Sequence, residues 1–93
     1  MRYTKKFIEA RFAMAMDACG LPHGETYSKR DDGTTKANVG VYFIDNYYGW
    51  QIRKMHNEGG AESHAFGSER RNAREFVALL TGIIETANLL KQR

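Results

Sequence analysis

The sequence predicts a single α+β domain in which an antiparallel meander of three or four strands is covered on one face by two helices. Three observations favour this class: helical periodicity near both ends of the chain, alternating apolar residues in its middle, and short turn-forming segments between the alternating stretches. With 93 residues, the chain can build one hydrophobic core and not two. We therefore expect residues 1–93 to form one domain with the element order α-β-β-β(-β)-α.

Composition narrows the functional class. Hydrophobic residues make up 42% of the chain and charged residues 27%, which is typical of a globular domain. The chain contains no apolar run of about 18 residues that could span a membrane, and no signal-peptide core follows its charged N-terminal residues. We expect a cytoplasmic protein without membrane contact. Its net charge of +3 permits contact with phosphates without requiring it.

The first predicted helix begins after Thr4, a capping residue, and runs to about Ala18. Its apolar stripe consists of Ile8, Phe12, Ala15, Met16 and Cys19. The helix ends at Gly20 and Pro22, because glycine readily takes the left-handed conformation after a last turn and proline cannot continue a helix. Cys19 is the only cysteine, so it cannot form an internal disulfide, and its place in the stripe favours a buried side chain over a reactive thiol.

The middle of the chain predicts strands. Residues 25–30 are compatible with a short edge strand, which Asp31, Asp32 and Gly33 would end in a turn. The strongest strand patterns, separated by turn-forming residues, cover 39–44, 50–56 and 61–66. Because side chains alternate along a strand, Arg53 and Lys54 are expected on opposite faces of the sheet.

The longest helical pattern runs from Ser68 to Leu90, and most of the chain is expected to pack on it. Its apolar face comprises Ala73, Phe76, Val77, Leu80, Ile83, Ile84, Ala87 and Leu90. Gly67 and Ser68 are expected to end the preceding strand and cap the helix. Gly82 lies inside this helix at a cost of up to about 1 kcal/mol relative to alanine. Close packing against a strand and a slight bend would each account for it.

Basic residues gather at the predicted start of this helix, at Arg70, Arg71 and Arg74. One interpretation is a solvated helix end in which Glu69 and Glu75 offset part of the positive charge. The other is an anion site, because a helix N-terminus and arginine side chains both favour phosphate. Arg53 or Lys54 of the neighbouring strand can extend such a patch, and only one of the two can face it.

The segment Gly67-Ser68-Glu69-Arg70-Arg71-Asn72-Ala73-Arg74 resembles the start of the last helix in double-stranded-RNA-binding domains, with arginines in place of that family's lysines. The predicted order helix, three strands, helix also looks like that family. The resemblance implies that Arg70, Arg71 and Arg74 contact phosphates across a major groove while the first helix lies along a minor groove. In general style, the chain is also similar to small accessory proteins of bacteriophages and prophages.

Aromatic residues form a second candidate site around the turn between the strands at 39–44 and 50–56. Tyr47, Tyr48 and Trp50 could present a knob to a protein partner or to a second copy of the chain. Alternatively, Phe43 and Trp50 belong to the core while the two tyrosines cover the end of a hairpin. Stacking on unpaired bases is a third interpretation, although no basic residues are interleaved with these aromatics.

No catalytic constellation is recognisable in the sequence. His56 and His64 flank Glu58 and Glu62 across a Gly-Gly turn, but the spacings of common metal sites are missing and surface histidines are the preferred interpretation. The sequence also lacks a nucleophile elbow and a phosphate-binding glycine loop. We expect no enzyme, cofactor, metal or small-molecule substrate.

Our leading hypothesis is a binding module that contacts duplex nucleic acid. Its candidate residues are Arg70, Arg71, Arg74, Arg53 and Lys54. The alternative is a small phage-type accessory protein that binds a protein partner, or forms a homodimer, through its aromatic hairpin. The candidate residues for that surface are Tyr47, Tyr48 and Trp50.

Overall fold

A computed structural model describes residues 3–67 and 69–92 and has an α+β fold. In chain order, its elements are α1 (Lys5–Cys19), β1 (Tyr27–Lys29), β2 (Thr35–Ala37), β3 (Tyr42–Asp45), β4 (Gln51–Met55), β5 (Glu62–Ala65) and α2 (Ala73–Lys91). The predicted fold class, with two helices enclosing a run of antiparallel strands, is confirmed. β2 was not predicted, because its three residues, Thr-Lys-Ala, carry no apolar alternation.

The main sheet is the predicted meander, in the order β3-β4-β5. Its antiparallel register pairs Ile44 with Ile52 and Ile52 with Ala65, which places these three residues on one face. The strand predicted at 39–44 begins later, at Tyr42. Its expected first residue, Val39, lies in a turn.

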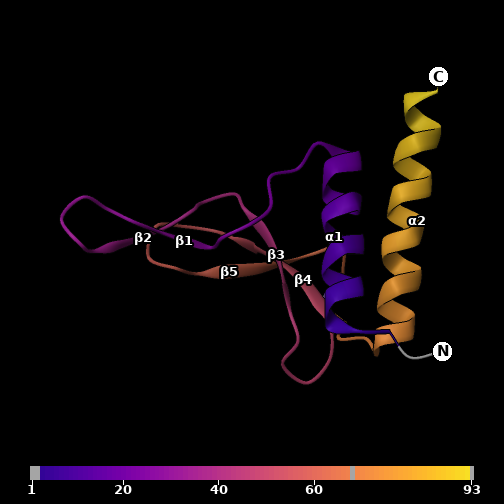
Figure 1. Cartoon of the computed structure of the whole chain (residues 1–93), viewed down its shortest axis with the longest axis horizontal. Coiled ribbons are helices and arrows are strands. Elements are labelled where there is room, and N and C mark those ends of the chain that lie inside the picture. The colour runs from indigo at the N-terminus through magenta and orange to yellow at the C-terminus, as the bar shows by residue number, and fades with distance from the viewer. Residues whose placement is uncertain (1–2, 68, 93) are drawn as a thin grey trace.

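Strands β1 and β2 form a separate two-stranded hairpin, which extends away from the helices (Figure 1). Its turn contains Asp32, whose carboxylate accepts hydrogen bonds from the hydroxyl and the amide of Thr34. Tyr27 lies against Gly60, in the connection between β4 and β5. A Cβ added to Gly60 would come within 2.6 Å of the Tyr27 hydroxyl oxygen. Glycine at position 60 therefore leaves room for the hairpin beside the main sheet.

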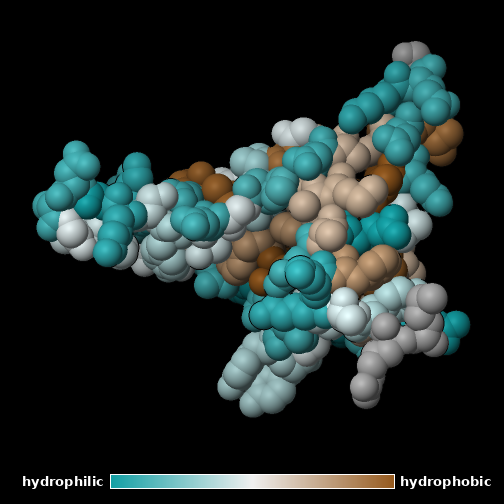
Figure 2. Space-filling model, viewed as in Figure 1, coloured by the Kyte–Doolittle hydropathy of each residue, from teal (hydrophilic) through white to brown (hydrophobic). Residues whose placement is uncertain are grey.

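Both helices cover the same face of the main sheet, lie side by side and begin at the same end of the molecule (Figure 1). The core between the two layers consists of Ile8, Phe12, Ala15, Met16, Trp50, Ile52, Phe76, Val77 and Leu80. Figure 2 shows hydrophobic atoms where the helices meet the sheet and hydrophilic atoms along the β1–β2 hairpin. α2 continues beyond the end of α1, so the last turns of α2 have less cover than its first turns (Figure 1).

The ends of α1 agree with the prediction. The Thr4 hydroxyl accepts a hydrogen bond from the Phe7 amide at 3.1 Å, and Gly20 takes a left-handed conformation with φ 69°. Cys19 was expected to be buried, and that prediction is wrong. The residue is exposed at the end of the helix. The position lies in the last turn, where the apolar stripe passes beyond the sheet.

The predicted start of the C-terminal helix at Ser68 is wrong. α2 begins at Ala73, and Asn72 caps it by accepting a hydrogen bond from the Glu75 amide at 2.8 Å. The Glu75 carboxylate in turn accepts from the Asn72 amide at 3.1 Å, which completes a capping box. The segment around Arg70 therefore precedes the helix, and Ser68 itself lies outside the described residues.

Candidate functional site

Arg70 ties together the connection between β3 and β4. Its guanidinium is 2.8 Å from a carboxylate oxygen of Asp45, at the end of β3. The same guanidinium donates to the backbone carbonyl of Tyr47 and, at 3.3 Å, to that of Gly49. A planar guanidinium can reach several acceptors at once with little loss of freedom per hydrogen bond. One side chain that lies 21 to 25 positions later in the sequence thus holds this turn in place.

Backbone hydrogen bonds hold the same turn from its other side. Trp50 and Arg71 exchange two hydrogen bonds, of 2.7 and 2.9 Å, so the segment before α2 pairs with the residue before β4. Gly49 lies against this segment with φ 116°, and a Cβ at that position would come within 3.1 Å of the Arg70 Cβ. The close approach and the positive φ together require glycine there.

The turn presents two tyrosine side chains to solvent, and we call this pair, Tyr47 and Tyr48, the aromatic knob. Tyr47 is 65% exposed and Tyr48 is 84% exposed. Their rings contact each other edge to face, with centroids 4.3 Å apart. Tyr48 adopts φ 62°, a left-handed conformation that bulky residues rarely take. The knob is therefore both exposed and conformationally defined.

The sequence left two interpretations of Trp50 open, a place on this surface and a place in the core, and the structure agrees with the second. Trp50 is only 8% exposed, and its ring stacks on Phe76 of α2 with centroids 5.7 Å apart and planes inclined by 19°. It belongs with Ile52, on the helix-covered face of the sheet. The tryptophan therefore anchors the turn in the core and leaves the two tyrosines outside.

The predicted basic residues occupy separate environments. Arg70 is engaged inside the turn, and the Arg71 guanidinium lies 3.9 Å from Glu69. Arg74 is exposed in the first turn of α2, where its side chain makes no hydrogen bond or ion pair with any residue that the structure describes. Arg53 and Lys54 have different partners again, Glu62 and the ring of Tyr42. Arg70, Arg71 and Arg74 are close together in the sequence but have different surroundings in the structure.

Arg53 and Lys54 lie on opposite faces of β4, as predicted. Arg53 donates to Glu62 at 2.8 Å and to Gln51 at 2.7 Å, on the face away from the helices. The Lys54 ammonium lies 5.6 Å from the ring centroid of Tyr42, on the other face. Neither side chain contacts the loop that contains Arg70.

Comparisons with known protein families, with curated proteins and with solved structures found no match. No helix among the described residues is long and apolar enough to cross a membrane. Within residues 3–67 and 69–92, no group of three or more His, Cys, Asp or Glu side chains is arranged to hold a metal ion.

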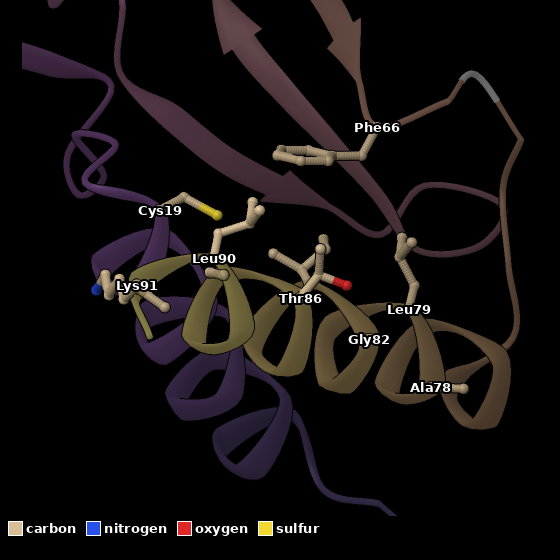
Figure 3. A pocket seen from close by; sticks show the side chains of 11 residues that line it. Cys19, Phe66, Ala78, Leu79, Gly82, Thr86, Leu90 and Lys91 are labelled. Atoms are coloured by element: carbon tan, nitrogen blue, oxygen red, sulfur yellow. The ribbon is translucent and has the colours of Figure 1, made fainter. Parts of the chain in front are cut away.

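Sequence reasoning missed a second surface feature, an apolar groove of about 690 Å³ that follows α2 from its second turn to its end. Its lining comprises Ala18, Cys19, Phe66, Ala78, Leu79, Gly82, Ile83, Thr86, Ala87, Leu90 and Lys91. In Figure 3, Phe66 faces Leu79, Thr86 and Leu90 across the groove, and Cys19 closes it at the end of α1. The one feature of the sequence that pointed to the groove was an apolar stripe on α2 that is longer than α1. The pattern did not show which residues cover the extra length.

Proposed function

We propose that this protein is a non-catalytic binding module that contacts a protein partner through the aromatic knob. The observation that carries the proposal is the support of the knob by Arg70. Three acceptors of one turn converge on its guanidinium, and the two side chains that the turn displays remain in solvent. The ion pair of Arg70 and the close packing at Gly49 hold a turn that lies outside the core. The packing of the core therefore does not explain them.

Exposed tyrosines are well suited to protein recognition. A tyrosine combines a large apolar ring with a hydroxyl, and it has few rotatable bonds to immobilise on binding. A turn that is already fixed loses little further conformational freedom when a partner covers it. The left-handed φ of Tyr48 supports the proposal, because strained residues concentrate at functional sites.

Site-specific photocrosslinking tests this function. A photoreactive phenylalanine analogue at Tyr48 is expected to trap a small, reproducible set of proteins in an extract of the host cell. The control carries the same analogue at Tyr27, which is also an exposed tyrosine and lies on the β1–β2 hairpin. Identical crosslinked species from both positions, or none from Tyr48, would contradict the proposal.

A second candidate function, contact with nucleic-acid phosphates, is favoured by one observation. Arg74 is exposed without a partner among the described residues, and the two helices begin at the same end of the molecule (Figure 1). Lys5 and Lys6 are exposed in the first turn of α1. Two helix starts and three cations at one end would favour a phosphate backbone. The resemblance to double-stranded-RNA-binding domains points to the same class of ligand.

Fluorescence anisotropy of labelled duplexes distinguishes the second candidate from the first. Duplex RNA or DNA binding that weakens steeply with salt, and weakens further in Arg74→Ala, would support phosphate contact. Tyr48→Asn serves as the control that leaves the cations unchanged. The absence of binding at low salt would remove this candidate and leave the protein-binding proposal standing.

A further inference from the structure

The main sheet ends in an unpaired edge at β5. Among the described residues, β5 pairs with β4 alone, and no isolated bridge reaches its other side. We propose that this edge pairs with the same edge of a second copy in antiparallel register, so that two three-stranded sheets become one continuous sheet. The aromatic knob takes no part in this contact, so the inference goes beyond the proposed function.

The register of β4 and β5 shows which backbone groups of β5 point outward. The amide of His56 donates to the carbonyl of Ala61 at 2.7 Å, and the hydrogen bonds of an antiparallel ladder recur at every second residue pair. Ser63 therefore bonds to β4, whereas the amide and carbonyl groups of Glu62 and His64 point away from it. No other described residue forms a backbone hydrogen bond with these outward groups.

The opposite edge of the main sheet is covered by the chain itself. In β3, Tyr42 has an outward-facing amide, which donates to the carbonyl of Pro22 at 2.9 Å. His23 forms an isolated bridge with the same tyrosine. The chain thus protects one edge of this sheet and leaves the other open, and an open edge is a template for a further strand.

β5 also lacks the features that keep edge strands apart. Proline, bulges and lysine side chains normally hinder such pairing. The strand Glu-Ser-His-Ala contains neither proline nor lysine, and it pairs with β4 without a bulge. The carboxylate of Glu62 is drawn back over the sheet by Arg53, at 2.8 Å. The strands of the β1–β2 hairpin, by contrast, carry the exposed residues Lys29 and Lys36.

Charge complementarity favours a second copy of this chain as the added strand. In an antiparallel pair centred on Ser63, Glu62 of each copy lies directly opposite His64 of the other copy. The imidazole gains an acceptor, and the carboxylate is held between it and Arg53 of its own chain. A centre one residue away would instead place Glu62 opposite Glu62, or His64 opposite His64. Among these symmetric registers, the one centred on Ser63 therefore pairs unlike groups.

The same register satisfies the backbone of the edge. Glu62 and His64 of each copy exchange hydrogen bonds with the opposing residues, about four bonds in all. The side chains on the other face of β5, Ser63 and Ala65, are small and leave the approach of a second strand unobstructed. Because the contact is short, we expect a weak dimer that dissociates on dilution.

Disulfide trapping tests both the pairing and its register. In a Cys19→Ser background, Ser63→Cys places two thiols at directly opposed positions, with Cα atoms about 4.5 Å apart and within reach of a disulfide. Ala65→Cys is the matched control, because it lies on the same face of the same strand but its two copies would be more than about 10 Å apart. Mild oxidation should yield a covalent dimer from Ser63→Cys and little from Ala65→Cys. Equal yields from the two positions, or none from position 63, would overturn the inference.

Sedimentation equilibrium measures the association without a crosslink. His64→Pro removes an outward amide and no hydrogen bond to β4, and it is expected to raise the dimer dissociation constant about tenfold or more. Thr35→Pro is the control, because it removes an outward amide from the exposed strand β2. Its dimer dissociation constant should match that of the parent. A parent that stays monomeric, or a dimer that persists unchanged in His64→Pro, would contradict the pairing of β5.

Amide hydrogen exchange of the unmodified protein keeps the test decisive if His64→Pro fails to fold. As the protein is concentrated, protection should rise several-fold at the amides of Glu62 and His64 and less at the amide of Ser63, which already bonds to β4. Unchanged protection at the two outward amides would overturn the inference. That outcome would leave the photocrosslinking test of Tyr48 unaffected, so the two proposals fail separately.

Discussion

The carboxylate of Asp45 and the guanidinium of Arg70 meet at 2.8 Å, although 24 residues separate them in the sequence. Their contact joins the end of β3 to the segment before α2. The remaining donors of Arg70 reach the carbonyls of the turn between them. Arg70, which the sequence made a candidate for phosphate contact, therefore supports the aromatic knob in the folded chain.

Replacement of Arg70 by alanine should destabilise the protein by about 1–2 kcal/mol, because charged hydrogen bonds are lost from a half-buried site. Urea denaturation measures this change. Arg74→Ala is the matched control, and its expected effect is below about 0.5 kcal/mol because Arg74 is exposed. Equal losses of stability in the two variants would show that the hydrogen bonds of Arg70 contribute no more than an ordinary surface charge.

Tyr48→Gly should stabilise the protein by about 0.5–1 kcal/mol, because glycine adopts φ 62° without the steric cost that tyrosine incurs. The same change removes one ring of the aromatic knob and should weaken pull-down of any partner that the photocrosslinking identifies. Tyr47→Gly is the control, since Tyr47 does not have a left-handed φ and should gain no stability. Thermal unfolding of both variants gives the comparison. A loss of stability in Tyr48→Gly would mean that ring contacts outweigh the backbone strain.

Phe76→Ala should cost about 3–5 kcal/mol, a large share of the stability of a domain this size. Phe76 is fully buried and stacks on Trp50, so its removal leaves a cavity between α2 and β4. Denaturation monitored by tryptophan fluorescence measures the loss and reports on the same ring pair. Leu89→Ala, at an exposed position of the same helix, should be nearly neutral. A small effect of Phe76→Ala would place the core elsewhere.

The β1–β2 hairpin should loosen in acid. Hydrogen bonds from the hydroxyl and the amide of Thr34 lower the pKa of Asp32 from its ordinary value. A lowered pKa in the folded protein means that the ionised carboxylate favours the folded turn. This contribution is present above the ordinary aspartate pKa, about 3.9, and is lost as pH falls through the lowered one. Nuclear magnetic resonance of the Thr34 amide between pH 6 and 2 follows the change.

Asp32→Ala is the comparison for the acid titration of this hairpin. Without the carboxylate, the Thr34 amide should lose its hydrogen bond at every pH, and its resonance should not titrate over this range. An unchanged titration in the variant would assign the pH dependence to another group. Because Asp32 lies in an exposed turn, the effect is expected to stay local to the hairpin.

Local patterns predicted the elements that local chemistry determines. Thr4 and Gly20 bound α1 as expected, since a cap and a left-handed glycine act within one helical turn. The start of α2 was readable in the same way, from Asn72 and Glu75, but the prediction placed the cap at Ser68 and set the boundary too early. A capping pair three residues apart is better evidence for a helix start than a single serine after a glycine.

The candidate site depended on contacts that no local pattern contains. The partners of Arg70 lie on a different element, and its role emerges only when β3 and α2 come together. The burial of Trp50 was partly readable, because alternation already put it on the same face as Ile52. The interpretation that placed it in a surface knob gave its sequence neighbours more weight than its strand position. The groove could not be predicted from the sequence, because its presence depends on how far α2 extends past the end of α1.

The packing of α1 against α2 also constrains how the chain acquires its structure during synthesis. The apolar stripe of α1 is complete early, but its partner lies more than fifty residues later. At about 5–20 residues per second, translation of that interval takes roughly 3–10 seconds, during which Ile8 and Phe12 have no core to enter. Nascent chains that stop short of Ala73 should therefore engage chaperones and be sensitive to proteases.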